Sequence, residues 1–187
     1  MTHALAAPEW DISEWLNTAQ PLQLSGLRGR VVVIHAFQML CPGCVSHGIP
    51  QATEIHNTFA SDDLVVVGLH SVFEHHAVMG PEALKVFVHE YHLQFPIGID
   101  RPVPGSALPS TMRSLGLKGT PSLIVVDRQG VIRLHHFGRA SDLGVGALLG
   151  RLLAEDAAPV AGVQAMSAQT HPQSGQPCLP DGCPVGR

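Results

Sequence analysis

The stretch that decides the fold is Val31-Val-Val-Ile-His-Ala-Phe-Gln-Met-Leu-Cys41-Pro42-Gly43-Cys44. It begins as an apolar run of strand length and ends in two cysteines separated by two residues. The residues that follow, 45–59, have the pattern of a helix, so the thiols are expected where a buried strand gives way to a helix. The first turn of a helix has unpaired N–H groups and a positive dipole end, which both favour a thiolate over a thiol. We therefore predict reactive thiol chemistry at this junction.

The two cysteines are predicted to have different roles. Cys41 is expected to be the exposed nucleophile, and Cys44, one turn later and facing inward, the resolving thiol. Pro42 suits a first helical position, because its ring fixes φ and its missing N–H would have no partner there. Pro50 is expected to kink the same helix, because a proline inside a helix removes a backbone hydrogen bond.

Length and composition are those of one globular domain with an appendage: 187 residues, 45% hydrophobic, with a net charge of -4. The chain has no polybasic patch, so nucleic acid is not expected as a partner. No apolar run approaches the roughly 20 residues that span a bilayer, and the N-terminus lacks the basic and apolar regions of a secretory signal. We expect a cytoplasmic protein, with a periplasmic location as the alternative if a leader was removed. Four cysteines in a reducing compartment are more often redox-active or metal-binding than structural.

Composition divides the chain into three parts: an amphipathic N-terminal segment over 1–20, a domain over 21–155, and a tail rich in proline and glycine over 156–187. Strands are predicted over 21–24 (at an edge), 31–37, 63–70 and 95–100, with a hairpin over 122–127 and 131–137. Helices are predicted over 45–59, 81–91, 110–115 (capped by Ser110) and 142–153 (capped by Ser141). This order predicts an α/β fold with a mixed sheet and helices on both faces.

The order of elements, with Cys41-Pro42-Gly43-Cys44 at the first strand–helix junction, resembles the thioredoxin fold and, more closely, its TlpA-like (redoxin) branch. The dipeptide Thr120-Pro121 and the hairpin turn over 127–130 carry the resemblance with the cysteine motif. Over about residues 20–155 the resemblance implies a three-layer α/β/α fold with a mixed central sheet. Residues 63–100 supply the strand–helix insertion that members of this branch carry.

The resemblance also implies a site. Pro121 would be cis and lie against the dithiol, and Thr120 would offer backbone groups to an extended substrate. Leu40 stands where the family usually has tryptophan, and we expect it to contact substrate together with Pro42 and Gly43. The dipeptide between the cysteines differs from the family's commoner choices and tunes the potential, so the direction of electron flow stays open. Members of this branch are typically exported or membrane-anchored, whereas no export signal is found here.

His35 occupies the position at which thioredoxins have a buried carboxylate that helps to remove the proton from the resolving thiol. It is either a replacement proton acceptor for Cys44 or a hydrogen-bonded histidine in a core strand. His47 either favours the thiolate or is a solvated helix residue. His89 and His92 have a spacing that would allow both to bind one metal ion, but we expect them to be solvated surface residues. Adjacent histidines such as His135-His136 point to opposite faces of a strand, and no metal site is assigned.

The tail contains a second cysteine pair, Cys178 and Cys183, around a turn favoured by Asp181-Gly182. This pair is a possible second redox pair, a metal clamp with His171, or part of a flexible tail with an adventitious disulfide. The linker to the last helix reaches on the order of 25 Å, so contact with the first pair is feasible.

These features predict a thiol–disulfide oxidoreductase that uses no cofactor other than its redox-active disulfide. Its partners would be a disulfide in a protein or small molecule and a thiol or dithiol reductant. A peroxiredoxin-like thiol peroxidase is the alternative, although Gln38 stands at that motif's threonine position and no proline lies between Val31 and Cys41. A redox-sensing or metal-binding thiol protein is the third possibility. A zinc ribbon would need its second cysteine pair much nearer in the sequence.

Overall fold

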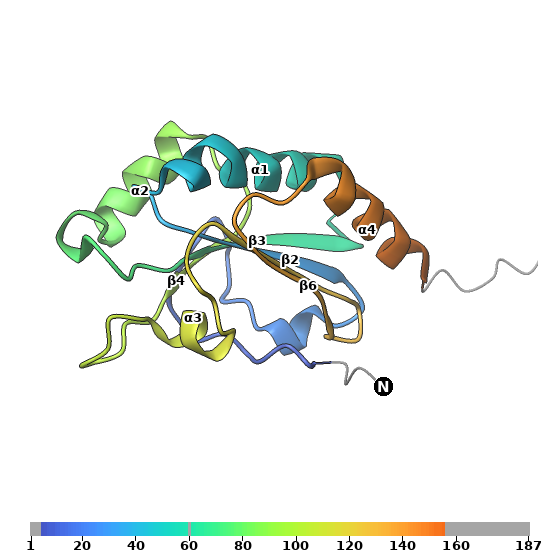
Figure 1. Cartoon of the computed structure of the whole chain (residues 1–187), viewed down its shortest axis with the longest axis horizontal. Coiled ribbons are helices and arrows are strands. Elements are labelled where there is room, and N and C mark those ends of the chain that lie inside the picture. Colours follow the sequence, from blue (N-terminus) through green and yellow to red (C-terminus); the bar gives the residue numbers. More distant parts are fainter. Residues whose placement is uncertain (1–4, 60, 156–187) are drawn as a thin grey trace, which may run out of the picture. The chain divides into compact units, whose positions relative to one another are not determined.

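The computed structural model describes residues 5–59 and 61–155 and contains a six-stranded sheet (Figure 1). Its strands are β1 (Ile12–Leu16), β2 (Val31–Phe37), β3 (Leu64–His70), β4 (Ile97–Asp100), β5 (Ser122–Val126) and β6 (Ile132–Phe137). Their order is β1-β4-β3-β2-β5-β6. β2, β3 and β4 are parallel, whereas β1, β5 and β6 are antiparallel to their neighbours. The sheet is therefore mixed, as predicted.

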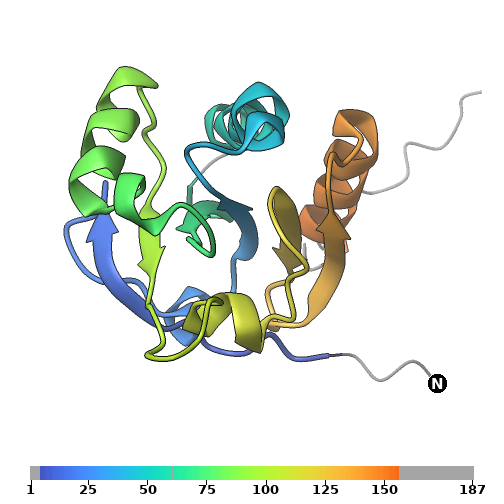
Figure 2. The same ribbon diagram turned by 60° about the vertical axis from the view of Figure 1, so that its left-hand side comes forward.

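Helices cover both faces of this sheet (Figures 1 and 2). One face packs against α1 (Ile49–Thr58), α2 (Pro81–Glu90) and α4 (Asp142–Glu155), and the other against α3 (Ser110–Ser114) and the 3-10 helix η1 (Leu24–Leu27). A second 3-10 helix, η3 (His76–Val78), precedes α2, and a π-helical turn, η2 (Cys44–Gly48), precedes α1. The three-layer α/β fold class is confirmed.

The central strand β2 is buried along its whole length. Val31, Val33 and Phe37 face the layer of α1 and share a cluster with Cys44, whereas Val32, Ile34 and Ala36 face the opposite layer. Alternate residues of a strand point to the same face. His35 therefore lies on the Cys44 side of the sheet, between Val33 and Phe37.

The edge of the sheet differs from the prediction. The strand expected over 21–24 is absent, because Leu24–Leu27 forms η1 and buries Leu24 and Leu27. The edge strand is Ile12–Leu16, which pairs with β4, so the amphipathic N-terminal segment joins the sheet. Its apolar face was recognised from the sequence, but the pairing partner lies more than 80 residues away and left no local signal.

The helix after the cysteine motif is not uniform. Residues 42–43 are helical, Cys44–Gly48 forms the π-helical turn, and α1 continues from Ile49. The N–H of Ile49 bonds to the carbonyl of Cys44, and Pro50 follows as the second residue of α1. The predicted disturbance at Pro50 thus takes the form of a widened turn just before it. Such π-helical turns are rare and frequently occur at functional sites.

The tail with Cys178, Cys183 and His171 lies outside the described residues. Over 5–59 and 61–155, no helix is long and apolar enough to cross a membrane.

Candidate active site

Cys41 and Cys44 lie where β2 gives way to the helix, as the sequence predicts. Cys41 is partly exposed and Cys44 is fully buried, and both are free thiols. The backbone N–H of Cys44 donates to Sγ of Cys41 over 3.2 Å, and Sγ of Cys41 donates to the carbonyl of Thr120 over 3.5 Å. The Cys41 sulfur thus accepts a hydrogen bond from an N–H at the start of the helix, where negative charge is stabilised.

The environment makes the two thiols unequal. Burial raises the pKa of the Cys44 thiol, and a hydrogen bond with Cys41 raises it further. Hydrogen bonds with the backbone of Gln38 and the side chain of Thr120 oppose this increase. An exposed thiol in front of a buried one is the arrangement that a nucleophile and a resolving partner require.

The loop before β5 closes over the dithiol. The Thr120–Pro121 peptide bond is cis. A Cβ at Gly43 would lie 3.3 Å from Cδ of Pro121, so the proline ring packs against the turn between the cysteines. The carbonyl of Pro121 accepts from the N–H of Gly138, while that of Thr120 faces Cys41. The structure therefore brings Thr120, Pro121 and Gly43 together with the thiols.

Two residues before the motif have opposite surroundings. Leu40 is 58% exposed beside Cys41, where an apolar side chain is free to meet a partner. Gln38 is buried, and its Oε1 accepts from the N–H of Phe73 over 3.2 Å, while its backbone carbonyl accepts from the N–H of Cys41. Gln38 thereby connects the segment that precedes Cys41 with the loop after β3. Sequence reasoning assigned Gln38 no such role.

His35 is buried beneath the π-helical turn. A Cβ at Gly48 would lie 2.2 Å from Cε1 of His35 and 3.3 Å from Cβ of Pro121. The imidazole therefore fits only because residue 48 has no side chain, and it lies between the turn and the cis-proline loop. Burial lowers the pKa of His35 to about 4, so the ring is neutral at pH 7. Its Nδ1 has no hydrogen-bond partner among the residues that the structure describes.

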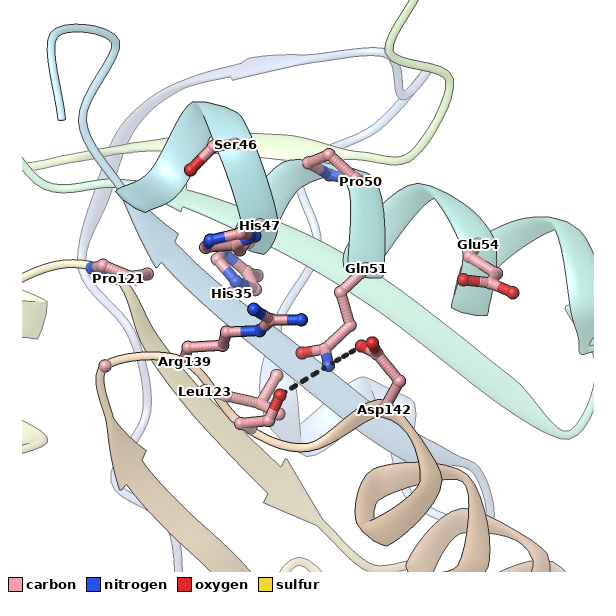
Figure 3. A pocket seen from close by; sticks show the side chains of 13 residues that line it. His35, Ser46, His47, Pro50, Gln51, Glu54, Pro121, Leu123, Arg139 and Asp142 are labelled. Atoms are coloured by element: carbon pink, nitrogen blue, oxygen red, sulfur yellow. Dashed lines mark hydrogen bonds between the residues drawn. The ribbon is translucent and has the colours of Figure 1, made fainter. Parts of the chain in front are cut away.

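A cavity of about 150 Å³ opens beside His35, between α1 and the loop that leads into α4 (Figure 3). The polar groups around it come from two elements. His47, Gln51 and Glu54 belong to the helical side, and Arg139 and Asp142 to the loop and the start of α4. Nε2 of Gln51 donates to Oδ1 of Asp142 over 2.6 Å and to the carbonyl of Ala140 over 3.2 Å, which joins the two walls.

The sequence analysis missed most of this cavity. Gly48 carried a usable signal, since an isolated glycine within a helical pattern often has a packing reason. Arg139 carried none, because it approaches His35 from a loop about a hundred residues later in the chain. His47 is exposed and lines the cavity with His35.

Four histidines considered as a possible metal site have partners of their own. Nε2 of His135 contacts the carbonyl of Leu115, and Nε2 of His136 contacts that of Arg139, so the two rings point apart as expected. The rings of His89 and His92 are 6.4 Å apart at the end of α2. Within the part of the chain that the structure describes, no cluster of three or more metal-ligating side chains is found.

Comparison with known proteins places this geometry in context. A family model described as Redoxin matches residues 6–142. A solved thioredoxin-like superfamily protein is 51% identical, covers 81% of this chain and 98% of its own, and superposes with a TM-score of 0.79. A solved thiol-disulfide isomerase from Corynebacterium glutamicum is also 51% identical, with coverage of 83% and 99% and a TM-score of 0.78.

Curated relatives are more distant and much longer. Protein DipZ of Mycobacterium tuberculosis is 27% identical over 163 residues, which are 86% of this chain and 22% of that protein. NHL repeat-containing protein 2 of Homo sapiens is 28% identical over 130 residues, which are 67% of this chain and 17% of that protein. This chain thus spans less than a quarter of the length of these relatives.

Proposed function

The chain belongs to the Redoxin family, and from that premise we propose that it is a thiol–disulfide oxidoreductase with Cys41 as nucleophile and Cys44 as resolving thiol. The observation that supports this most directly is the pairing of a partly exposed thiol with a buried one, 3.2 Å from the Cys41 sulfur to the Cys44 nitrogen. The solved relative described as a thiol-disulfide isomerase supports the same reaction class.

The proposed reaction exchanges one disulfide for another. The Cys41 thiolate attacks a substrate disulfide, a Cys41–substrate bond forms, and the first substrate thiolate leaves. The Cys44 thiol loses its proton and attacks the Cys41 sulfur, so that the Cys41–Cys44 disulfide forms and the second substrate thiolate leaves. The substrate gains two electrons and two protons, and the dithiol loses both. An external thiol or dithiol then reduces the Cys41–Cys44 disulfide.

Substrate recognition is proposed for the surface around Cys41. The backbone of Thr120 would pair with an extended disulfide-containing segment, as the family resemblance implies, and the exposed Leu40 would contact its apolar side chains. Pro42 and Gly43 form the turn over which this segment passes. The reaction needs no cofactor beyond the dithiol, and the substrate is a disulfide in a protein or a small molecule.

His35 is proposed as the proton acceptor for Cys44. It lies on the same face of β2 as the cluster that contains Cys44, beneath Gly48 at the end of the π-helical turn that begins at Cys44. Its neutral imidazole has a free electron pair at one nitrogen, which can accept a proton.

Reduction of insulin disulfides, with a dithiol supplying electrons, tests the assignment of the thiols. We expect wild type to turn over, and both Cys41→Ser and Cys44→Ser to fall to the uncatalysed rate. Cys178→Ser/Cys183→Ser is the matched control, because it removes two thiols outside the proposed site. A loss in this control as well would show that the tail pair takes part as a second redox pair.

The peroxidase alternative is measured in the same preparations. If wild type leaves insulin intact but consumes hydrogen peroxide through Cys41 alone, the proposed function is wrong. The buried side chain of Gln38, at the position where that motif has threonine, argues against peroxide turnover.

A cytoplasmic location is proposed on the grounds of cysteine usage, because a reducing compartment keeps Cys41 and Cys44 as a dithiol. Fractionation with alkylation of free thiols measures both the compartment and the redox state. Recovery of the oxidised protein from the periplasm would favour the alternative location.

A further inference from the structure

Gln38 directly follows the last residue of β2, at the point where the pairing of the central strands ends. On the β5 side the pairing of β2 ends with Ala36 opposite Ser122, and on the β3 side it ends with Phe37 opposite His70. The regular ladder of the sheet therefore does not extend to the peptide groups on either side of Gln38. The residue is nevertheless only 1% exposed, so other contacts must hold these groups inside the protein.

The two peptide groups that flank Gln38 each face one of the cysteines. The carbonyl of Gln38 accepts a hydrogen bond from the N–H of Cys41 over 3.2 Å. On the other side, a hydrogen bond between Cys44 and the backbone of Gln38 lowers the pKa of the Cys44 thiol, against the larger effect of burial. A bond that lowers the pKa of an acid stabilises its anion, so the N–H of Gln38 is the donor to the Cys44 sulfur. Gln38 thus contacts both cysteines of the motif.

The loop after β3 holds these peptide groups in place, since β2 and β3 lie side by side (Figure 1). The carbonyl of Phe37 belongs to the same peptide group as the N–H of Gln38, and it accepts from the N–H of Ser71 over 3.1 Å. Oε1 of Gln38 accepts from the N–H of Phe73 over 3.2 Å, and its Nε2 donates to Oε1 of Glu74 over 3.4 Å. The amide side chain therefore fixes its own backbone from a second direction.

The loop itself is anchored in the sheet. The hydroxyl of Ser71 donates to Oδ2 of Asp100 on β4 over 2.8 Å, and both side chains are buried. Hydrogen bonds that involve a charged acceptor are stronger than those between neutral groups. The loop after β3 is therefore a firm support for the side chain of Gln38.

The attack by Cys44 requires a donor at this position. Burial raises the pKa of the Cys44 thiol to about 12, so the group is protonated at neutral pH. Negative charge appears on its sulfur only as the proton leaves and the sulfur approaches Cys41. An N–H that is already fixed toward this sulfur stabilises the charged state more than the neutral thiol, which lowers the barrier to the attack.

We propose that Gln38 is a positioning residue for the resolving step: its side-chain amide, held by the loop after β3, orients the backbone N–H that faces Cys44. The inference rests on the proposed function and deepens it. In this step Cys44 gives up its proton, which ends in solvent, and its sulfur forms the bond to the Cys41 sulfur. The bond between Cys41 and the substrate breaks, and the substrate sulfur leaves as a thiolate with the electron pair of that bond.

Single-turnover kinetics isolates the resolving step. The reduced full-length protein carries Cys178→Ser/Cys183→Ser, so that only the proposed site reacts, and it is mixed with an excess of an aromatic disulfide whose released thiolate is coloured. The first phase is the attack by Cys41, and the second phase, absent in Cys44→Ser, is the attack by Cys44. Reduction of the oxidised protein by dithiothreitol, followed by alkylation and mass spectrometry, measures the reverse kind of step, in which Cys44 is the leaving group.

Gln38→Met keeps the length of the side chain and removes its hydrogen-bonding groups. It should leave the first phase within about twofold and slow the second about tenfold. A rise of one unit in the pKa of Cys44 slows its attack about threefold, because the loss of thiolate outweighs the gain in nucleophilicity, and misplacement of the sulfur adds to this. Reduction by dithiothreitol should slow by a similar factor, since a less stabilised thiolate leaves more slowly. The equilibrium constant with dithiothreitol should stay within about twofold.

Thr111→Val is the matched control, because it also removes a side-chain acceptor from a partly buried backbone N–H. Oγ1 of Thr111 accepts from the N–H of Asp11 over 2.8 Å, and Thr111 lies on α3, on the opposite face of the sheet from Cys44. Like Gln38→Met, this variant should lower the free energy of unfolding, which urea titration measures. It should change neither kinetic phase and leave reduction by dithiothreitol unaltered.

Three results would overturn the positioning role while the proposed function stands. They are a normal second phase in folded Gln38→Met, an equal slowing in Thr111→Val, and a slowing in one direction only with a shifted equilibrium constant. If Gln38→Met does not fold, Gln38→Asn decides, because its amide is one carbon shorter and no longer reaches Phe73 from the same backbone position. A normal second phase in Gln38→Asn then contradicts the proposal. Absence of the first phase in wild type overturns the proposed function, and this inference with it.

Discussion

Two buried histidines stand on neighbouring strands of one sheet, His35 on β2 and His70 on β3. Burial lowers the pKa of each to about 4, so both are neutral at pH 7. Both nitrogens of His70 are enclosed without a hydrogen-bond partner, and its ring packs against Phe37 with centroids 5.3 Å apart. His35 instead has only Nδ1 enclosed, and it lies against Gly48 and lines a polar cavity.

The comparison shows that the burial of a histidine ring and the access of that ring to solvent are separate properties. Desolvation shifts the titration of both rings in the same direction, so a shifted pKa by itself does not distinguish a working group from a packed one. The difference lies in what each ring touches: His70 contacts an apolar ring, whereas His35 touches the turn that carries the thiols and a space that reaches solvent. On this basis, activity should depend on His35, and both residues should affect acid stability.

Replacing each histidine with leucine should give the largest contrast. When the reduced protein reacts in a single turnover with an excess of an aromatic disulfide, the first phase is the attack by Cys41 and the second, called the Cys44 phase, is the attack by Cys44. His35→Leu is expected to slow the Cys44 phase about a hundredfold, because it removes the proposed proton acceptor without opening a large space. His70→Leu should leave both phases within about twofold. Stopped-flow absorbance measures the rates, and circular dichroism verifies folding. Equal losses in the two variants would show that buried imidazole matters here only for packing.

The second contrast concerns acid stability. A ring whose pKa falls from 6.5 in the unfolded chain to about 4 in the folded one binds fewer protons when folded. Its contribution is therefore fully present above pH 6.5 and is lost as the pH falls toward 4, by about 3 kcal/mol for a shift of this size. Urea unfolding at pH 7 and pH 4 should show a smaller loss in His70→Leu than in wild type.

Urea unfolding at pH 7 and pH 4 also compares the contributions of His35 and His70 to acid stability. We expect His35→Leu to reduce the acid loss by less than His70→Leu does, because cavity water solvates part of the charge that forms on His35. A larger effect at His35 than at His70 would contradict the expectation that cavity water solvates the charged His35 ring.

The smallest predicted effects come from two matched glycines. A Cβ at Gly48 would lie 2.2 Å from the His35 ring, and a Cβ at Gly68 would lie 2.9 Å from the Phe95 ring. Overpacking should cost each alanine variant roughly 1–3 kcal/mol of unfolding free energy. Only Gly48→Ala should also slow the Cys44 phase, because it displaces His35.

Gly146→Ala is the control for the glycine pair. A Cβ at Gly146 would have open space around it within α4, so this substitution should stabilise the protein by about 0.5–1 kcal/mol. A loss of Cys44 reactivity in Gly68→Ala equal to that in Gly48→Ala would show that general strain, and not the position of His35, controls the reaction.

Much of the fold was predictable because its signals are local. The continuous apolar runs of β2 and β3 are typical of strands covered on both faces, and both strands lie where the sequence predicts them. The turn at 127–130 joins β5 and β6 as an antiparallel hairpin, as predicted. The cysteine motif at the strand–helix junction needed no knowledge of distant residues.

The predictions from sequence were wrong where residues far away in the chain determine the local structure. Ser110 was expected to cap the helix over 110–115, but Pro109 is the capping residue and Asp100 on β4 accepts the N–H groups of Thr111 and Met112. Burial raises the pKa of Asp100, and these hydrogen bonds oppose that increase. A cap supplied by another strand leaves no pattern within the helix itself.

Local sequence patterns were sufficient to predict the strands β2 to β6, the four α-helices, and the placement of the two thiols at the start of a helix. These follow from hydrophobic periodicity and from backbone preferences of neighbouring residues, which act over a few positions. The packing of distant elements places His35 at a polar cavity and His70 against the ring of Phe37. That difference depends on Gly48, Pro121 and Arg139, which lie far apart in the chain and meet His35 only when the sheet and the helices pack together.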